Sequence, residues 1–522
     1  MILKNLLVND FETVLKSWWS DISPVSKKAF LWTFLTINFI FLWHTLTFIP
    51  DNHSLGLLKS GIPLTFQYTT HMGRFAGGIL QQLVGGNIFP IFNNVICYGF
   101  FSLALIYLAN YWSVPKTAVC YTLFSLMIAL MPYTLPWVYF IRHQTYFVDI
   151  FLMIWALTLL LNPNIFKILL SSLIFLMCLG TYPAMIQFIG IALLGRCLAD
   201  RIYKRCSCKD LYKKYKSTLI SICLSIGFFL IIETLLYING QIDRIPQTSF
   251  EFPRLQKIKQ VFTLYITPIP YISQWLKILL ILPFLGILLS TVFKKDFLAF
   301  LLVFGIFCIA NLINLCSPFP NMYITRIQFW NAPWFYACFA IMALRYTPIT
   351  KNIIMFIMCI IIYHSSIQDM KWQKIYFFES TQEIAYWINI IHEIHNHPNF
   401  DATHKYNIHL IGIPSYRRSF TPDSTWHDVH FFIWNHYIDG YFSQIHIKEI
   451  FDFFEPKSYV NNIKHTQHIS TAHIPFKFCI LLQSVADTNS QNKLVYLTDS
   501  DIYIVSNNQT LKAIQNRICS QQ

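Results

Sequence analysis

The chain has 522 residues, of which 55% are hydrophobic, 17% are aromatic and only 12% are charged. This composition excludes a set of soluble domains, a disordered chain, a coiled coil and a disulfide scaffold, and it is typical of a polytopic α-helical membrane protein. Residues 1–364 carry 27 Lys and Arg against 11 Asp and Glu, whereas residues 365–522 carry 12 against 14. The positive charges thus lie between apolar segments, where they set topology and do not indicate binding to nucleic acid.

The first 28 residues precede the first apolar segment and show no signal-peptide pattern. Asp10 can cap a short helix there. The pattern predicts an amphipathic segment on the cytoplasmic membrane surface, because four apolar residues share one face of that helix: Phe11, Val14, Leu15 and Trp18.

Residues 29–364 are predicted to form a transmembrane domain. A spanning helix needs about 20 mostly apolar residues. Eleven segments come near this length: 29–49, 89–109, 117–133, 145–161, 165–180, 181–198, 218–239, 271–293, 297–316, 331–346 and 349–364.

Orientation follows from the Lys and Arg of the short connections. Segment 199–217 is strongly basic and is predicted to be a cytoplasmic loop. If successive segments alternate in direction, further basic residues fall on the same side: Lys27, Lys28, Lys116, Lys294 and Lys295. The N-terminus is therefore predicted to be cytoplasmic, and residues 365–522 to lie outside.

Residues 365–522 are predicted to form a small extracytoplasmic α/β domain with its own core. Ser380 and Glu383 form a capping box in front of an apolar helical face that ends before Pro398. Strand patterns follow at Tyr406–Ile413, at Lys477–Leu482 and, as a hairpin, at Leu494–Leu497 and Ile502–Val505.

The cysteines and histidines give weak signals. Cys206 and Cys208 lack a second pair, and the spacing of His392, His395 and His397 permits only a partial metal site, so no metal ligand is assigned. The two tail cysteines can form a disulfide if the tail is outside the cytoplasm, but their spacing leaves this open: Cys479 and Cys519.

Charged residues at the predicted outer boundary are the candidates for chemistry. Asp51 follows the first apolar segment, where it can act as a general base or merely cap a helix. Arg74 can bind a phosphate or extend to the headgroup region. Asp149 lies inside an apolar segment, where it marks a functional site or pairs with Arg142. Arg326 is in an aromatic segment that suits a phosphate or sugar, although an aromatic belt has the same composition.

The order of several short motifs carries more information than any one of them. Asp51-Asn52 follows the first apolar segment, and Gly73-Arg74-Phe75 comes later. Thr181-Tyr182-Pro183-Ala184 opens a mid-chain helix, and the tail passes from Glu383-Ile384-Ala385 to Ile408-His409-Leu410-Ile411-Gly412. Together with the topology, this order resembles the bacterial GtrII-type glucosyltransferases, membrane enzymes of the GT-C class, over most of the chain. Asn52 and Pro183 depart from the family pattern, which has an acid and a glutamine at these places.

The resemblance implies a glycosyltransferase in the bacterial cytoplasmic membrane. Such an enzyme moves a sugar, typically glucose, with inversion from a polyprenyl-phosphate donor to a surface glycan such as O-antigen or lipopolysaccharide. Asp51 would activate the acceptor hydroxyl, and the leaving phosphate would be bound by Arg74, Arg326 and His71. Supporting residues would be Asn52, Gly73, Arg142, Asp149 and Tyr182. A requirement for a divalent metal stays open.

Tail aromatic residues suit stacking on sugars, although core packing explains them equally well: Trp426, Trp434, Tyr437 and Tyr441. Two other classes of function remain. A transporter or flippase for a lipid-linked glycan should place charged residues near the bilayer midplane, whereas the candidates here gather at the outer boundary. A membrane receptor should tolerate substitution of Asp51 and Arg74.

Overall fold

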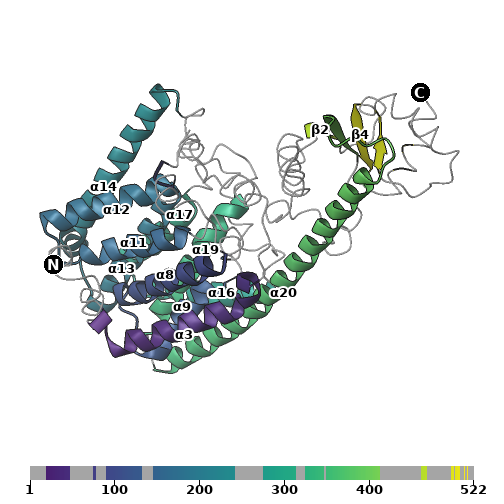
Figure 1. Cartoon of the computed structure of the whole chain (residues 1–522). Coiled ribbons are helices and arrows are strands. Elements are labelled where there is room, and N and C mark those ends of the chain that lie inside the picture. The colour runs from purple at the N-terminus through teal and green to yellow at the C-terminus, as the bar shows by residue number, and fades with distance from the viewer. Residues whose placement is uncertain are drawn as a thin grey trace. The chain divides into compact units, whose positions relative to one another are not determined.

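The computed structural model describes residues 19–20, 22–46, 75–77, 90–131, 134, 145–241, 274–312, 324–345, 348–411, 460–466, 495–498, 500–505, 511 and 514. Within these ranges the chain is mostly helical and has one small sheet (Figure 1). The described residues up to Met370 form one compact unit, a helical bundle, and those from Lys371 onward form a second unit that contains the sheet.

Each of the eleven predicted apolar segments overlaps a helix. These helices are α3 (Pro24–Ile40), α8 (Pro90–Tyr111), α9 (Ala118–Ala129), α11 (Thr145–Leu159), α12 (Ile165–Thr181), α13 (Met185–Lys204), α14 (Cys208–Ile238), α16 (Gln274–Phe293), α17 (Phe297–Ala310), α19 (Ile324–Ala343) and α20 (Pro348–His395). A short helix, α4 (Leu42–Leu46), follows α3.

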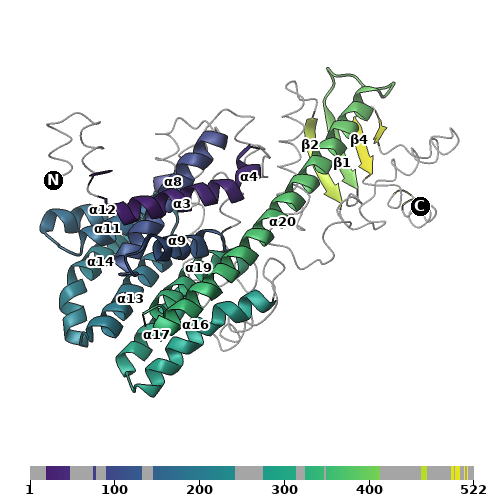
Figure 2. The ribbon, with the colours of Figure 1, turned by 90° about the horizontal axis from the view of Figure 1, so that it is seen from below.

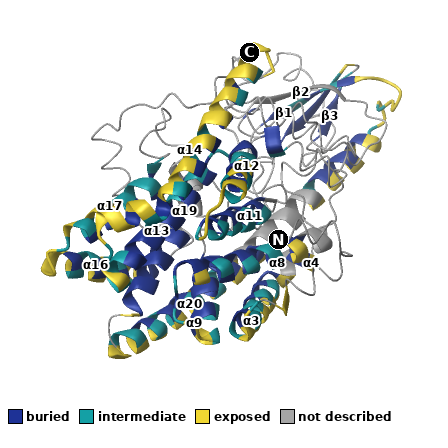
Figure 3. Cartoon of the chain, turned by 90° about the vertical axis from the view of Figure 1, so that its left-hand side faces the viewer, coloured by how far each residue is buried: buried dark blue, intermediate teal, exposed yellow. Residues whose placement is uncertain are grey.

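Within the described part of the chain, 4 helices are long and apolar enough to cross a membrane. Their apolar stretches are Asn94–Tyr111, Cys208–Ile238, Trp275–Phe293 and Pro348–Lys371. Shorter apolar helices accompany them, among them α9, α11, α12 and α17. Apolar side chains are exposed along α14, α16 and α17, whereas α13 is largely buried (Figure 3). Exposed apolar faces of this length indicate a membrane protein.

The predicted basic loop 199–217 is wrong as a loop. α13 continues to Lys204 and α14 begins at Cys208, so most of the segment is helical. Arg205 adopts a left-handed conformation with φ 52° that ends α13, and Ser207 forms a capping box with Asp210 that starts α14. Lys and Arg have high helix propensity, so both helices extend past their apolar segments. The charged side chains then lie beyond the apolar part of each helix, where water can reach them.

The capping box predicted at Ser380 and Glu383 is also wrong as a helix start. α20 runs without a break from Pro348 to His395, through the position where a new helix was expected. No Pro or Gly occurs between residues 349 and 397, so nothing in the sequence interrupts the backbone hydrogen bonding. The predicted end before Pro398 is confirmed, because the helix stops at His395.

Contacts between helix ends show that successive helices of the bundle alternate in direction (Figure 2). Asn110 near the end of α8 donates to Ser26 at the start of α3, at 3.5 Å. The Cys178 thiol near the end of α12 lies 3.5 Å from the carbonyl oxygen of Asp149 near the start of α11. Arg201 near the end of α13 pairs at 2.9 Å with Asp296, which precedes α17.

This alternation gathers most of the described Lys and Arg of the bundle at one end. We call this the basic end, and it contains the connections 112–117, 160–164, 205–207 and 294–296. We call the other end, which contains residues 145–149, 178–184 and 233–238, the polar end. Lys277 and Arg326 lie outside the basic end, whose Lys and Arg are Lys27, Lys28, Lys116, Lys167, Arg196, Arg201, Lys204, Arg205, Lys209, Lys213, Lys214, Lys216, Lys294, Lys295, Arg345 and Lys351.

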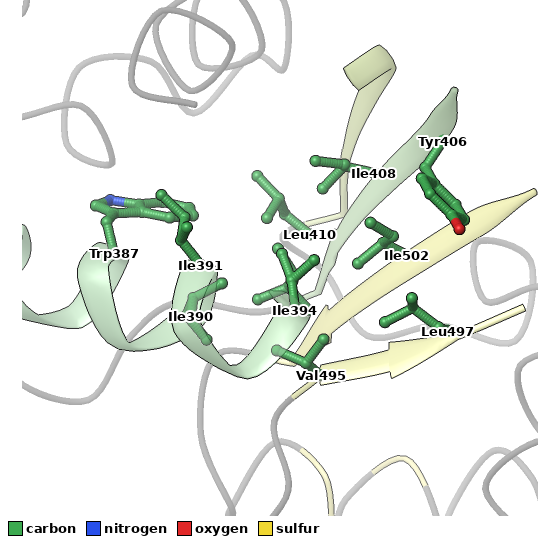
Figure 4. Packing of buried hydrophobic residues seen from close by; sticks show 11 residues of the cluster. Trp387, Ile390, Ile391, Ile394, Tyr406, Ile408, Leu410, Val495, Leu497 and Ile502 are labelled. Atoms are coloured by element: carbon green, nitrogen blue, oxygen red, sulfur yellow. The ribbon is translucent and has the colours of Figure 1, made fainter. Parts of the chain in front are cut away.

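The second unit packs the end of α20 against a sheet of strand order β2-β1-β4-β3. Strand β1 (Tyr406–Ile411) is parallel to β2 (Val460–Thr466) and β4 (Asp501–Val505), and β3 (Val495–Leu497) is antiparallel to β4. The β3–β4 hairpin and the strand starting at Tyr406 are confirmed, whereas β2 was not predicted and the expected strand 477–482 lies outside the described residues. The core joins one helix face to one sheet face (Figure 4): Trp387, Ile390, Ile391, Ile394, Tyr406, Ile408, Leu410, Val495, Leu497, Ile502 and Ile504.

Candidate functional site

Many of the predicted site residues lie outside the described part of the chain. These are Asp51, Asn52, His71, Gly73, Arg74 and Arg142. The candidate residues of the tail lie outside it as well: Cys479, Cys519, Trp426, Trp434, Tyr437 and Tyr441. Arg326 falls in the first turn of α19, where the structure describes the backbone. Asp149 and Tyr182 are described, and both lie at the polar end.

Asp149 is a buried carboxyl group on the second turn of α11, with 1% of its surface exposed. The hydroxyl of Thr181, at the end of α12, donates to the carbonyl oxygen of Met177 at 3.0 Å and lies within hydrogen-bond reach of the Asp149 carboxyl group. The thiol of Cys178 contacts the backbone of Asp149. The start of α11 and the end of α12 thus enclose an ionisable group between two apolar helices.

Tyr182 ends α12, because its backbone turns to an extended conformation and its N–H donates to Cys178 at 3.0 Å. Its ring lies against that of Tyr146, with ring centroids 5.3 Å apart. Tyr146 precedes Asp149 by almost one helical turn. The structure therefore brings together two residues that the sequence analysis proposed separately, Asp149 and Tyr182, through the contact of Tyr146 with Tyr182.

Helix α14 packs beside α12 in the same direction. Near the basic end, the hydroxyl groups of Ser172 and Ser221 are 2.8 Å apart. Further along, Phe229 and Leu179 belong to one apolar cluster with Phe75, and the rings of Phe75 and Phe229 are 6.1 Å apart. Phe75 is the last residue of the Gly73-Arg74-Phe75 motif, so the motif leads into the polar end of the bundle.

Glu233 follows Phe229 by one turn on the buried face of α14. Its surface is 3% exposed, although it is a carboxylic acid in a strongly apolar helix. Ile232 and Leu236, its neighbours on the helix surface, pack against the cluster that contains Phe75 and Phe229. Glu233 therefore lies beside the last turn of α12, on the flank opposite α11.

Several buried polar atoms at the polar end have no hydrogen-bond partner among the residues that the structure describes. They are Oδ1 of Asn94, Oδ2 of Asp149 and both carboxyl oxygens of Glu233. Asn94 is near the start of α8, whose aromatic residues pack on those of α11, as Phe101 does on Phe147 at 4.3 Å. A buried carboxyl oxygen without a partner is costly, so such groups mark sites where a ligand or ion can bind.

Carboxylates at the basic end are paired. Asp200 is 2% exposed and accepts hydrogen bonds from Lys214 and Tyr215, while Arg196 and Lys204 lie 3.6 and 3.4 Å away. Burial alone raises the pKa of Asp200, but the hydrogen bonds from Lys214 and Tyr215 and the nearby positive charges outweigh it and lower the pKa below 3.8. The charged groups at the basic end therefore pair with one another and stabilise the packing of the helices.

Arg196 illustrates how these pairs connect the helices. From α13 its guanidinium donates to the carbonyl oxygen of Tyr111, the last residue of α8, and to the hydroxyl of Ser113, which follows α8. Arg345 donates to the carbonyl oxygen of Ser113 and lies 4.1 Å from the ring centroid of Tyr203. The connection after α8 is therefore held by cations from α13 and from the end of α19.

The second unit contains a separate polar cluster between neighbouring strands. Nε2 of His409 on β1 lies 2.8 Å from Oδ1 of Asp501 on β4, and the hydroxyl of Ser500 donates to Oδ2 of Asp501 at 2.7 Å. The rings of His409 and Tyr503 stack at 4.6 Å. Partial burial raises the pKa of Asp501, but the hydrogen bonds from Ser500 and His409 lower it below its ordinary value overall.

The described residues include no group of three or more His, Cys, Asp or Glu side chains that could hold a metal ion. His392, on the last turn of α20, hydrogen bonds with Asn396 at 2.8 Å. The sequence pattern included Phe75 and Thr181 only as parts of motifs, and it gave no role to Gly180 or Asn94, for which the signals were a glycine and an asparagine inside apolar helices. Comparison with models of known protein families and with curated proteins finds no match.

Proposed function

We propose that the protein is a membrane glycosyltransferase of the GT-C class, similar to the GtrII-type enzymes, that moves glucose from a polyprenyl-phosphate donor to a surface polysaccharide such as O-antigen. The observation that carries the proposal is the polar end: buried carboxyl and amide groups surround the end of α12, opposite the basic end. Transfer from a lipid-linked donor needs such a polar site within reach of one membrane surface.

The proposed topology has eleven spanning helices, with the basic end in the cytoplasm and the polar end at the outer surface of a bacterial inner membrane. The alternation of helix directions and the collection of Lys and Arg at one end support it. The N-terminus is then cytoplasmic, and residues 365–522 form an extracytoplasmic α/β domain after the transmembrane domain of residues 29–364.

In the proposed reaction Asp51 is the general base that takes the proton from an acceptor hydroxyl, and the acceptor oxygen attacks the anomeric carbon as the polyprenyl phosphate leaves. Arg74 stabilises the leaving phosphate, assisted by Arg326 and His71. The position of Phe75 supports a role for Arg74, because Phe75 packs on α12 and α14 at the polar end and is its neighbour in the chain. Asp149 and Tyr182 shape the site.

A carrier for a lipid-linked glycan is the second candidate, since buried carboxyl groups within helices are typical of transport pathways. The positions of the groups favour the enzyme. Asp149 is the fifth residue of α11, and Glu233 lies five residues before the end of α14. Both are therefore near one end of their helices, which suits a surface reaction better than a binding site at the midplane.

Glycan mass spectrometry tests the proposal. Cells that express the wild-type protein, the Asp51→Asn variant, the Asp210→Asn control variant or no protein are compared at matched membrane levels. Asp210 is an exposed capping residue at the basic end, so its substitution should not affect transfer. Wild type and the control should add a hexose to the surface glycan, and Asp51→Asn should not.

Three other results bear on the proposal. If Asp51→Asn modifies glycan as well as wild type does, Asp51 is not the base. If wild type adds no sugar in several hosts, the enzyme proposal fails, and uptake of a lipid-linked glycan into proteoliposomes then tests the carrier. Transfer from purified polyprenyl-phosphate glucose by the purified protein would establish donor and activity directly.

A further inference from the structure

We propose that Glu233 and Asp149 bind the hydroxyl groups of a sugar at the polar end, on the two flanks of the end of α12. The inference rests on the proposed function for the identity of the sugar as the donor glycosyl group. It assigns to Glu233 a ligand that neither the order of motifs nor the family resemblance suggests. The roles are those of binding residues, separate from the proposed base Asp51.

The carboxylates of the bundle differ between its two ends in whether they have partners. Among those described in α3 to α19, Asp200, Asp210 and Asp296 lie at the basic end, and each has a partner: cations for Asp200, Ser207 for Asp210 and Arg201 for Asp296. Asp149 and Glu233 lie at the polar end, where both have carboxyl oxygens without a partner in the described structure. Asp369, on α20, is also buried with both carboxyl oxygens unpartnered. Asp149 and Glu233 are 1% and 3% exposed, about as buried as Asp200 at 2%, so contact with water does not replace the missing partners.

The buried face of α14 leads to Glu233 through a row of residues whose contacts are satisfied. Going toward the polar end, its buried residues Ser221, Ser225 and Phe229 precede Glu233 at intervals of four. The two serine hydroxyls are satisfied, because Ser221 donates to Ile168 and Ser225 to Ser221. Phe229 packs on Phe75 and Leu179. Each residue of this row before Glu233 therefore has a hydrogen-bond or packing partner on α12 or within α14.

The unpartnered carboxyl oxygens of Asp149 and Glu233 need a ligand that donates hydrogen bonds. Helix α12 ends at Thr181 and Tyr182 is its cap, so no further helical turn of α12 lies between α11 and α14. A carboxylate accepts hydrogen bonds, and its ligand must supply donors. Neighbouring hydroxyl groups of a pyranose supply such donors in pairs, and the half-buried ring of Tyr182, which packs on Tyr146, adds an apolar surface for a sugar face.

Binding of methyl β-D-glucopyranoside to the protein in lipid nanodiscs tests the inference independently of transfer. Saturation-transfer NMR compares wild type, Glu233→Gln, Asp149→Asn and the control Asp210→Asn. Loss of a hydrogen bond to a charged group weakens binding by about ten-fold or more, which is the expected effect of Glu233→Gln and Asp149→Asn. The control should bind as wild type does. Equal melting temperatures of the variants exclude a folding defect.

Monodeoxy analogues of the same glucoside identify the contact. The analogue that lacks the hydroxyl bound by Glu233 should bind wild type about ten-fold more weakly than the parent sugar. It should bind Glu233→Gln as well as the parent sugar does, because the contact is already lost. If every analogue discriminates equally between wild type and Glu233→Gln, the carboxylate does not touch the sugar and the inference is wrong.

The other outcomes separate this inference from the proposed function. If wild type transfers glucose but both variants bind the glucoside normally, the function stands and the sugar site fails. If wild type transfers nothing yet binds the glucoside through Glu233, the site stands and the transferase proposal fails. Binding that EDTA abolishes and Mg²⁺ restores would assign the carboxylates to a cation and overturn the inference.

Discussion

Gly180 on α12 lies directly beneath the ring of Phe75. A Cβ atom at position 180 would be 2.5 Å from Cζ of Phe75, which is closer than two carbon atoms can approach. The ring also packs on Phe229 of α14, so it fills the space between the ends of two helices. The absence of a side chain at position 180 is thus what allows the chain after Arg74 to lie at the polar end.

Gly180→Ala should displace Phe75 and lower the free energy of unfolding by about 1–3 kcal/mol, as other overpacked sites do. Since Arg74 is the neighbour of Phe75, sugar transfer should fall more than the membrane level of the protein does. Thermal unfolding of the detergent-solubilised protein and glycan mass spectrometry measure the two effects.

Gly227→Ala on α14 is the matched control, because a Cβ there meets no atom within 4 Å. The substitution should leave transfer unchanged and should stabilise the helix slightly, since alanine favours helix over glycine. Normal transfer by Gly180→Ala would show that the placement of Phe75 does not matter for the reaction.

Asp200→Asn should be strongly destabilising. The carboxylate is buried among Arg196, Lys204 and Lys214, and its removal leaves the least exposed of these cations, Arg196, without its ion pair. Breaking a buried pair in this way costs about 3 kcal/mol or more. The melting temperature in detergent should fall clearly for Asp200→Asn and hardly at all for the exposed Asp210→Asn.

The pH dependence of this difference has a definite sign. The pKa of Asp200 is lowered in the folded protein, so the stabilisation is complete above the ordinary pKa of 3.8 and is lost as the pH falls through the lower folded value. The difference between wild type and Asp200→Asn should therefore be constant from about pH 5 to pH 8 and shrink below about pH 4. A difference that grew on acidification would contradict the assigned pairing.

Much of the bundle follows from the sequence, because apolar length alone located each helix from α3 to α20. The end of α13 and the start of α14 did not follow, since polarity marks the membrane boundary and not the end of a helix. Strand β2 was missed because Val460–Thr466 is polar and becomes a strand through its pairing with β1. Tertiary pairing of this kind leaves little trace in local composition.

The candidate site was predictable only in part. A carboxylic acid within an apolar segment marked Asp149 from the sequence alone, whereas Thr181 and Tyr182 were expected to open a helix and instead end α12. That these residues meet depends on the antiparallel packing of α11 and α12, which no local pattern specifies. The contact of Phe75 with Gly180 joins residues far apart in the chain and required the fold.

Ile390 and Ile388 differ in exposure on the same helix, and this difference makes a prediction for the second unit. Ile390 is 1% exposed in the core between α20 and the sheet, whereas Ile388 is 47% exposed. Ile390→Ala should cost about 2–5 kcal/mol and make the tail more sensitive to protease, and Ile388→Ala should leave it nearly as resistant as wild type. Equal sensitivity of the two variants would contradict the packing of α20 on the sheet.

Cys208 provides a test of orientation. It is an exposed free cysteine at the basic end, on the first turn of α14. If the basic end is cytoplasmic, reagents outside the cell cannot reach it. A membrane-impermeant maleimide should label Cys208 in inverted membrane vesicles and not in spheroplasts, as followed by peptide mass spectrometry. An Ala402→Cys variant, at an exposed position before β1, should show the opposite pattern. Labelling of Cys208 in spheroplasts, with Ala402→Cys reacting only in inverted vesicles, would show that the orientation is the reverse of the one proposed. The polar end would then lie on the cytoplasmic side, where it could not reach a lipid-linked donor at the outer leaflet.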